Sequence, residues 1–345
     1  MSRHDFETAV EITRGDLVES AHSAAIAVAD TEGRVVFALG DAERTVYLRS
    51  AAKPFQAAAV LSAGVAERYG FTAKEIALIS ASHAGEPVHT ETATAILARA
   101  GLDPSALGCG THAPFSRLAA ETLLREGRNP TVLMNNCSGK HGGMLAAARK
   151  AGEPIETYLA SAHPVQRRIL RAVAAFTGRE EGRIALAIDG CSAPTFAVSL
   201  RELARAFARL VAAPSLRTDP DGLDAQAAIV AAAMRAHPEM VSGGGMLDTI
   251  LMRAVPGLVA KMGADGLHAV GWTGPHGPVG AAVKIMDGDS GRARMAVVVE
   301  MLRQAGAVDA HATLPQSLTD PLIVRSLRGA AVGEVRPVFR LRSRA

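Results

Sequence analysis

Residues 45–56 constrain the fold more than any other part of the chain, because they place a strand, a tight turn and a helix in immediate succession. Their sequence is TVYLRSAAKPFQ, and an alanine-rich run over residues 57–63 follows. The β-branched and aromatic residues at the start predict a strand, and the alanine-rich run predicts a helix. Pro54 indicates that the regular helix begins near that residue, so Ser50 and Lys53 share a tighter turn before it. A serine at such a junction is held at a fixed point with its hydroxyl exposed.

The spacing between Ser50 and Lys53 suits a pair of reacting groups. Residues three apart lie on one side of a helical turn, and they also eclipse in a 3-10 turn. A serine hydroxyl becomes a good nucleophile when a base takes its proton, and a partly desolvated lysine with a lowered pKa can be that base. The same spacing arises by chance in many chains, where it gives a helix cap beside a solvated lysine. The remaining motifs decide between these interpretations.

Composition excludes several classes of protein. The 345 residues, of which 48% are apolar, suffice for one large α/β domain or two small ones. We see no internal repeat or domain boundary, so we predict a single domain over residues 1–345.

No apolar run approaches the roughly 20 residues that cross a bilayer, and residues 1–15 lack a signal-peptide core. We therefore expect a cytoplasmic protein with no membrane partner. Acidic and basic residues interleave at a net charge of +3, and the single tryptophan and three tyrosines offer few stacking platforms, so we expect no nucleic-acid partner.

Apolar periodicity and turn residues predict a mixed α/β chain that opens with an antiparallel meander. The predicted strands are residues 7–13, 24–29, 35–39, 45–48, 131–134, 183–188, 267–272, 279–286 and 333–341. The predicted helices are residues 57–63, 90–100, 116–126, 144–151, 164–176, 198–212, 222–236, 246–254 and 289–305. Polar loops follow several of these elements, and sites tend to form in such loops.

Two cysteines, Cys137 and Cys191, each follow a predicted strand in a glycine-bearing turn, where cysteine has no packing role. Three cysteines in a chain without a secretion signal suggest metal binding or chemistry rather than disulfides. Only six of the 37 basic residues are lysines, and Lys140 lies near Cys137. Two thiolates with a nitrogen or carboxylate oxygen suit Zn²⁺ with an open fourth position. Two independent thiols are the competing interpretation.

Seven segments together resemble the Rhizobium etli-type L-asparaginases, and they occur in the order of that family. The segments are RSAAKPFQ (49–56), SASHAGEPVH (80–89), CGTHAP (109–114), NNCSGKHGGML (135–145), IDGCSAPTFA (188–197), LDTILM (247–252) and KMGADG (261–266). The resemblance covers most of the chain. Met246 departs from the polar or arginine residue expected there, which bears on the substrate-side loop.

The resemblance implies an α/β fold of the α+β type, like that of serine β-lactamases and penicillin-binding proteins, with a central, mostly antiparallel sheet flanked by helices. It also implies a homodimer. Ser50 is then the nucleophile with Lys53 as its base, and Ser82 with Lys261 forms a second pair that assists proton transfer. The implied zinc ligands are Cys137, Lys140 and Cys191. The residues expected on the substrate side are Arg49, His83 and Asp189.

We therefore predict an amidohydrolase that converts L-asparagine to L-aspartate and ammonia. A zinc hydrolase with a metal-bound water nucleophile is the first alternative. A non-enzymatic metal- or amide-binding protein on the same scaffold is the second. We also expect Lys53, Lys140 and Lys261 to lie close together and to lower one another's pKa values by repulsion.

Overall fold

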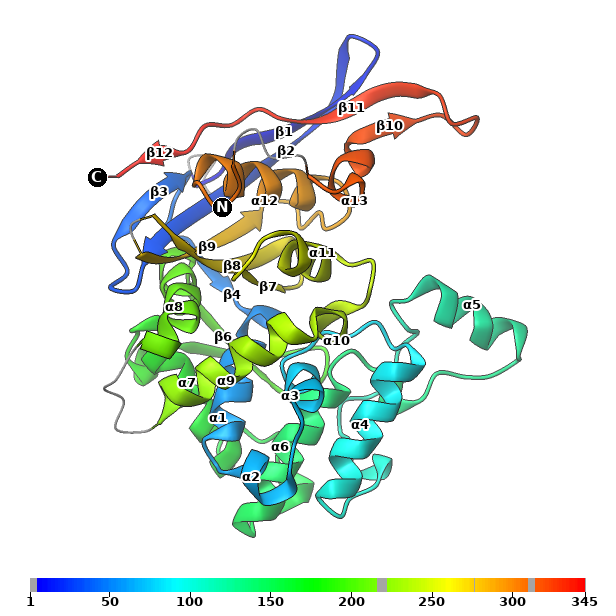
Figure 1. The fold of residues 1–345 in the computed structure, drawn as a ribbon, viewed down its shortest axis with the longest axis vertical. Coiled ribbons are helices and arrows are strands. Elements are labelled where there is room, and N and C mark those ends of the chain that lie inside the picture. The colour runs from blue at the N-terminus through cyan, green and yellow to red at the C-terminus, as the bar shows by residue number, and fades with distance from the viewer. Residues whose placement is uncertain (1–4, 216–221, 276, 310–313, 345) are drawn as a thin grey trace. The chain divides into compact units, whose positions relative to one another are not determined.

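The computed structural model describes residues 5–215, 222–275, 277–309 and 314–344 (Figure 1). The chain divides into two compact units, each assembled from separated segments. The first unit comprises Met1–Ala51, Val198–Ala212 and Ile250–Ala345, and the second comprises Ala52–Ala197 and Ala213–Thr249. Because these segments alternate along the chain, no single linker marks a boundary in the sequence. Among the described helices, none is both long and apolar enough to cross a bilayer.

The first unit is built on a curled antiparallel sheet in the order β10-β11-β1-β2-β9-β8-β7, with β3 on β2 and β12 on β3. The middle of β2 is buried on both faces, which explains its unbroken apolar run AAIAVA. The strands are β1 (Glu7–Arg14), β2 (Leu17–Asp30), β3 (Val35–Leu39), β7 (Val259–Met262), β8 (Leu267–Gly274), β9 (Gly277–Ile285), β10 (Ile323–Arg325), β11 (Ala331–Pro337) and β12 (Arg342–Ser343).

Two long helices cover this sheet. Helix α8 (Leu200–Ala212) packs against β2, β8 and β9, and α12 (Ala293–Gln304) contacts β1, β8, β9 and β11. The approach of α8 depends on small residues in the strands. A Cβ atom on Gly280 would lie 2.1 Å from the carbonyl oxygen of Ala204, and one on Gly271 would lie 2.5 Å from that of Phe207. Glycine at both positions therefore lets the helix backbone lie directly on the sheet.

The second unit is a helical assembly around α1 (Lys53–Leu61), all nine residues of which are buried. Helix α1 packs against α9, α7 and α6, and α3 packs against α9, α6 and α4. A helix without a polar face is stable only inside such a bundle. The surrounding helices are α2 (Val65–Tyr69), α3 (Ala73–Ile79), α4 (Pro87–Arg99), α5 (Arg117–Arg125), α6 (Ser138–Ala151), α7 (Pro164–Thr177), α9 (Leu223–Ala236) and α10 (Pro238–Ser242).

The remaining described elements are short. In the second unit, β5 (Ala185–Ile188) pairs antiparallel with β6 (Pro194–Ser199) across the turn that carries Cys191. The others are β4 (Thr45–Tyr47), α11 (Leu247–Ala254), α13 (Gln316–Thr319) and the single 3-10 turns between helices. The predicted mixture of helices with an antiparallel sheet is confirmed, whereas the likeness to β-lactamases stays a prediction.

Two predicted elements around the cysteine motif are wrong. Residues 131–134 are not a strand, because Val132–Met134 form one 3-10 turn. Helix α6 begins at Ser138, six residues before the predicted start, so the whole SGKHGG segment is helical rather than loop. Its glycines serve helix packing: a Cβ atom on Gly139 would lie 2.4 Å from the Leu78 carbonyl oxygen, and one on Gly143 would lie 2.7 Å from Ile79. Tertiary packing overrides the low helix propensity of glycine here.

Candidate active site

Lys53 is the first residue of α1, and its side chain is buried inside the second unit with 1% exposure. Its Nζ atom lies 2.6 Å from the carbonyl oxygen of Ala81, 2.9 Å from the Ser82 hydroxyl and 3.4 Å from the carbonyl oxygen of Asn136. Ser82 follows the end of α3, and Asn136 precedes α6. Three segments far apart in the sequence therefore converge on one amine.

The three oxygens differ in what they can exchange with the amine. A carbonyl oxygen only accepts, so Ala81 and Asn136 each take an N–H from Lys53. The Ser82 hydroxyl can accept a third N–H from an ammonium or donate its own proton to the lone pair of a neutral amine. Both protonation states of Lys53 are therefore fully hydrogen-bonded, and Ser82 is the partner through which a proton can pass.

Ser50 lies in the 3-10 turn Arg49–Ala52, which joins β4 to α1 as the sequence predicts. The turn begins with a strained residue, since Arg49 has φ of +47°. A non-glycine residue in this left-handed region costs on the order of 1 kcal/mol, and such strain concentrates at functional sites. The Arg49 guanidinium lies 2.7 Å from the Asp265 carboxylate within the first unit. This ion pair, which the sequence did not suggest, orients the residue predicted to face substrate.

Lys261, the other predicted catalytic lysine, lies in β7 of the first unit. It is fully buried, and its Nζ donates to the Met262 carbonyl oxygen at 3.1 Å. Pairing of β7 with β8 sets Lys261 opposite Ala269. Lys261 belongs to the first unit and Ser82 to the second, so their pairing stays a prediction.

The predicted metal ligands gather in the second unit. Cys137 is the N-cap residue of α6, Lys140 lies in its first turn, and Cys191 lies in the β5–β6 turn; all three side chains are buried. Lys140 Nζ is 3.1 Å from Cys191 Sγ. A hydrogen bond from Cys191 holds the pKa of Cys137 well below its usual range, against burial, with help from the charges of Lys53 and Lys140. The same bond, together with burial, raises the pKa of Cys191.

The expected lowering of lysine pKa values is wrong for Lys140. Burial lowers the pKa of Lys140, but attraction to Cys137 and Cys191, with a smaller contribution from Asp189, outweighs burial and raises it. A thiolate next to an ammonium stabilises the charged form of both. The lowered pKa of Cys137 and the raised pKa of Lys140 therefore both favour a thiolate beside an ammonium.

The donor set suits zinc on one condition. Within residues 5–215, 222–275, 277–309 and 314–344, no three His, Cys, Asp or Glu side chains gather as a metal site. Cys137 and Cys191 thus supply the only two conventional ligands of the predicted set, and Lys140 supplies an amine. An amine binds a metal only after losing its proton, which a metal ion can displace. The three residues fit zinc when Lys140 is neutral.

Comparison with known families supplies the evidence that geometry alone does not. The family model described as L-asparaginase II matches residues 10–337, nearly the whole chain. The chain belongs to the L-asparaginase II family. Membership supports an amidohydrolase, and it agrees with the family resemblance of the sequence motifs. The finer assignment to the Rhizobium etli type, the serine–lysine chemistry and the zinc stay predictions.

Other comparisons add little to this family assignment. No curated protein matches the sequence. Two solved structures, titled "Crystal Structure Analysis of Mglu" and "Crystal Structure Analysis of Mglu in its glutamate form", are similar at 16% and 17% identity with TM-scores of 0.37 and 0.35. The matches cover 85% and 84% of this chain, which spans 69% and 63% of those two chains. A likeness at this level carries no functional argument.

The sequence did not reveal several groups of this candidate site. The carbonyl oxygens of Ala81 and Asn136 give no signal, because every residue carries one. His83, predicted to face substrate, is fully buried with both ring nitrogens within hydrogen-bond distance of the Gly85 amide and the Ser138 hydroxyl. Direct contact with substrate would require one of these bonds to break. Asp189 lies in the β5–β6 turn, where its carboxylate accepts from the Gly190 amide.

Proposed function

We propose that the protein is an L-asparaginase that hydrolyses L-asparagine to L-aspartate and ammonia through a serine nucleophile activated by lysine. The observation that carries the proposal is the buried amine of Lys53, which begins α1 three residues after Ser50 and contacts Ser82 at 2.9 Å. Membership of the L-asparaginase II family supports the reaction class. A buried amine with a hydroxyl partner is the arrangement that a lysine base needs.

In the proposed reaction, Ser50 Oγ attacks the side-chain amide carbon while its proton moves to neutral Lys53. Backbone N–H groups near Ser50 stabilise the oxyanion. The proton then passes from Lys53 to the amide nitrogen, the C–N bond breaks, and ammonia leaves. Water attacks the acyl-enzyme, its proton returns through Lys53, and aspartate leaves as Ser50 Oγ regains a proton. Ser82 is the relay on the far side of the amine.

The remaining predicted residues take supporting roles in this proposal. Lys261 acts with Ser82 as a second serine–lysine pair. Arg49 and Asp189 bind the charged groups of asparagine, a carboxylate and an ammonium respectively, by charge complementarity. Two subunits form a homodimer, which light scattering at the elution peak would verify.

Zinc completes the proposal. Cys137, Cys191 and neutral Lys140 would hold the ion, with a fourth position open. When bound, zinc would supply a positive charge that orients substrate rather than an activated water. Lys140 Nζ lies 3.1 Å from Cys191 Sγ, so two of the three proposed ligands are already adjacent.

Ser50→Ala tests the serine assignment. The variant should fold normally and lose asparagine hydrolysis by about 10⁴-fold or more, the loss typical of removing a serine nucleophile. Ammonia release by wild type and variant, measured side by side, gives the answer. Activity of the variant within tenfold of wild type would refute Ser50 as the nucleophile. Mass spectrometry of quenched wild-type turnover should detect an acyl group on Ser50.

Metal analysis tests the zinc assignment and separates the alternatives. We expect about one zinc per subunit after purification with zinc, and none in the Cys137→Ser/Cys191→Ser double variant. Chelation should raise KM more than it lowers kcat. Unchanged zinc in the double variant would remove this site. Complete loss of kcat on chelation would favour the zinc hydrolase with metal-bound water.

A further inference from the structure

Two stacked histidines close the loop that carries Ser82. The Gly85 N–H donates to Nδ1 of His83 at 3.2 Å, and the adjacent Glu86 N–H donates to Nδ1 of His89 at 3.1 Å. Both rings are completely buried, and their centroids lie 5.1 Å apart at 15° between planes. His89 occupies the third position of α4 and takes the place that glutamate or glutamine has in a capping box.

The outer nitrogens of the two rings reach two other helices. His83 Nε2 lies 2.9 Å from the Ser138 hydroxyl at the start of α6, and His89 Nε2 lies 3.0 Å from the Glu239 carbonyl oxygen in α10. Ser138 donates its own proton to the Leu133 carbonyl oxygen at 2.9 Å, so it accepts from His83. Since each Nδ1 accepts from an amide, each neutral ring carries its proton on Nε2.

Ser82 itself is tied to the same two helical neighbourhoods through the backbone. Its N–H donates to the Val241 carbonyl oxygen at 2.8 Å, and the N–H of His83 donates to the Asn136 carbonyl oxygen at 3.3 Å. That Asn136 oxygen is also one of the three acceptors of Lys53. The position of the Ser82 loop therefore fixes two of the three contacts of the buried amine.

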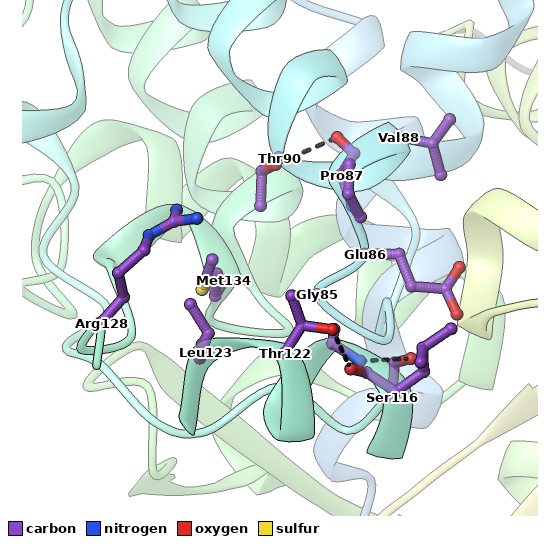
Figure 2. A pocket seen from close by; sticks show the side chains of 12 residues that line it. Gly85, Glu86, Pro87, Val88, Thr90, Ser116, Thr122, Leu123, Arg128 and Met134 are labelled. Carbon is purple, nitrogen blue, oxygen red and sulfur yellow. Dashed lines mark hydrogen bonds between the residues drawn. The ribbon is translucent and has the colours of Figure 1, made fainter. Parts of the chain in front are cut away.

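Close packing holds only part of the outer side of the loop, where Gly85 packs against Pro114 and Met134 and the Ser116 N–H donates to the Ala84 carbonyl oxygen at 2.9 Å. A pocket of about 530 Å³ lies there, lined by Gly85, Glu86, Pro87 and side chains of α5, with Arg128 on the opposite wall (Figure 2). Figure 2 shows the Glu86 carboxylate lying at the edge of this space. The hydrogen bonds of His83 and His89 on the inner side therefore add to these contacts in keeping the loop in place.

We propose that His83 and His89 are positioning residues that hold Ser82 against Lys53 and do so only as neutral rings protonated on Nε2. The proposal rests on the proposed function, in which Ser82 relays protons to and from Lys53. Neither ring touches the reacting atoms. Protonation of either ring would place an Nδ1–H against the amide N–H that it now accepts, and the loop would be released.

The charges around His83 lower its pKa, whereas those around His89 act on its pKa in both directions. Burial, His89, Lys53 of α1 and His112 all lower the pKa of His83 far below its usual value. Burial and Lys74 of α3 lower the pKa of His89, while the Glu239 carbonyl and the carboxylates of Glu86 and Glu239 work in the opposite direction. Because the pKa values of His83 and His89 are both lowered in the folded protein, both rings are neutral at neutral pH and their hydrogen bonds to the loop are intact. The free energy of unfolding falls as the pH drops below the unfolded histidine value of about 6.5.

The chain offers a matched set of variants. In His83→Asn, the side-chain oxygen can still accept from the amide two residues on, as in an Asx turn, while the link to Ser138 is lost. Ser138→Ala removes the same link from the other end. His163 is the control, because its Nδ1 accepts from the Val165 N–H at 3.1 Å and its Nε2 lies 3.0 Å from the Pro154 carbonyl oxygen. Like His83 it is buried, and it is the N-cap residue of α7.

His83→Asn and Ser138→Ala should each lower kcat for asparagine by about 10- to 100-fold, the loss that a displacement near 1 Å can cause, with KM within about twofold. The double variant should be no slower than either single one, because both remove one link. His163→Asn should lower Tm comparably and leave kcat unchanged. Equal kcat losses in His163→Asn, or additive losses in the double variant, would overturn the positioning role.

Nuclear magnetic resonance gives a readout that does not need activity. The ring ¹⁵N shifts of His83 and His89 should show the Nε2–H form at pH 7, and each ring should titrate below the usual histidine pKa of about 6.5. Amide exchange at Ser82, Gly85 and Glu86 should accelerate in His83→Asn/Ser138→Ala. An Nδ1–H form, a charged ring at pH 7 or unchanged exchange would overturn the proposal. A wild type that does not hydrolyse asparagine would refute the proposed function, while these measurements would still decide whether the rings hold the loop.

Discussion

Two buried lysines in the second unit have opposite surroundings. Lys53 is 1% exposed and contacts two carbonyl oxygens and a hydroxyl, whereas Lys140 is 3% exposed and contacts the sulfur of Cys191 beside the Cys137 thiolate. Burial disfavours the Lys140 ammonium, but attraction to Cys137 and Cys191 outweighs burial. The Cys137 thiolate interacts with both amines, whereas the Cys191 sulfur lies 3.1 Å from Lys140.

The difference separates the possible roles of the two amines. When Lys53 loses a proton, its two carbonyl partners and the Ser82 hydroxyl stay hydrogen-bonded, and Lys140 still compensates the Cys137 thiolate. When Lys140 loses a proton, the sulfurs of Cys137 and Cys191 lose the charge of their nearer amine unless a metal ion replaces it. Lys53 therefore suits repeated proton transfer, and Lys140 suits a fixed charge or a metal ligand.

Replacing each lysine by arginine should give the largest difference in kcat between the two positions. Arginine keeps the charge but cannot act as a base. Lys53→Arg should lower kcat by about 10³- to 10⁴-fold, as removal of a general base does. Lys140→Arg should lose zinc and raise KM while keeping kcat within about tenfold. Ammonia release at saturating asparagine, with circular dichroism as the folding control, measures both. Wild-type kcat in Lys53→Arg would show that the amine is only a charge.

Removing one interacting side chain from each lysine should lower the free energy of unfolding by different amounts. In metal-free protein, Cys137→Ala leaves the Lys140 ammonium without its thiolate, which should cost about 3–5 kcal/mol of unfolding free energy. Adding Lys140→Met should recover most of that loss. Ser82→Ala removes one neutral acceptor from Lys53 and should cost only about 1–3 kcal/mol. Urea denaturation after chelation gives all three values. Equal losses for Cys137→Ala and Ser82→Ala would contradict the difference between the two environments.

The smallest effect on stability should come from the packing of α6, which carries Lys140, against α3, which leads to the Ser82 partner of Lys53. Gly139 lies on α6 beside Lys140, against the Leu78 carbonyl oxygen of α3, and α3 leads to Ser82. Gly139→Ala should push these helices apart and lower the free energy of unfolding by about 1–3 kcal/mol. Gly190→Ala is the control, since nothing lies within 4 Å of the added Cβ, and it should change stability by less than about 0.5 kcal/mol. Similar Tm values for both variants would rule out close packing at Gly139.

The sequence predicted local features better than contacts. The strand, tight turn and helix around Ser50 are confirmed, because β-branched residues, Pro54 and alanines each favour one local structure. The start of α6 at Ser138 was missed, since close packing against α3, invisible in the sequence, favours its glycines. The raised pKa of Lys140 was missed for a related reason: the distance to a thiolate on another residue cannot be read from composition. Motif order pointed correctly to the L-asparaginase II family, while the Rhizobium etli type stays a prediction.

The alternation of segments between the two units has a consequence for folding. Val10 of β1 pairs with Pro337 of β11, and Ala24 of β2 pairs with Ile285 of β9. Strands β1 and β2 therefore pair with strands that are synthesised much later, and contacts of such long sequence separation form slowly. The last segment of the helical unit ends at Thr249, before any of those partners is synthesised. On the ribosome, the helices can consequently pack first, while the β1–β2 hairpin keeps both of its edges open to mispairing and depends most on chaperones.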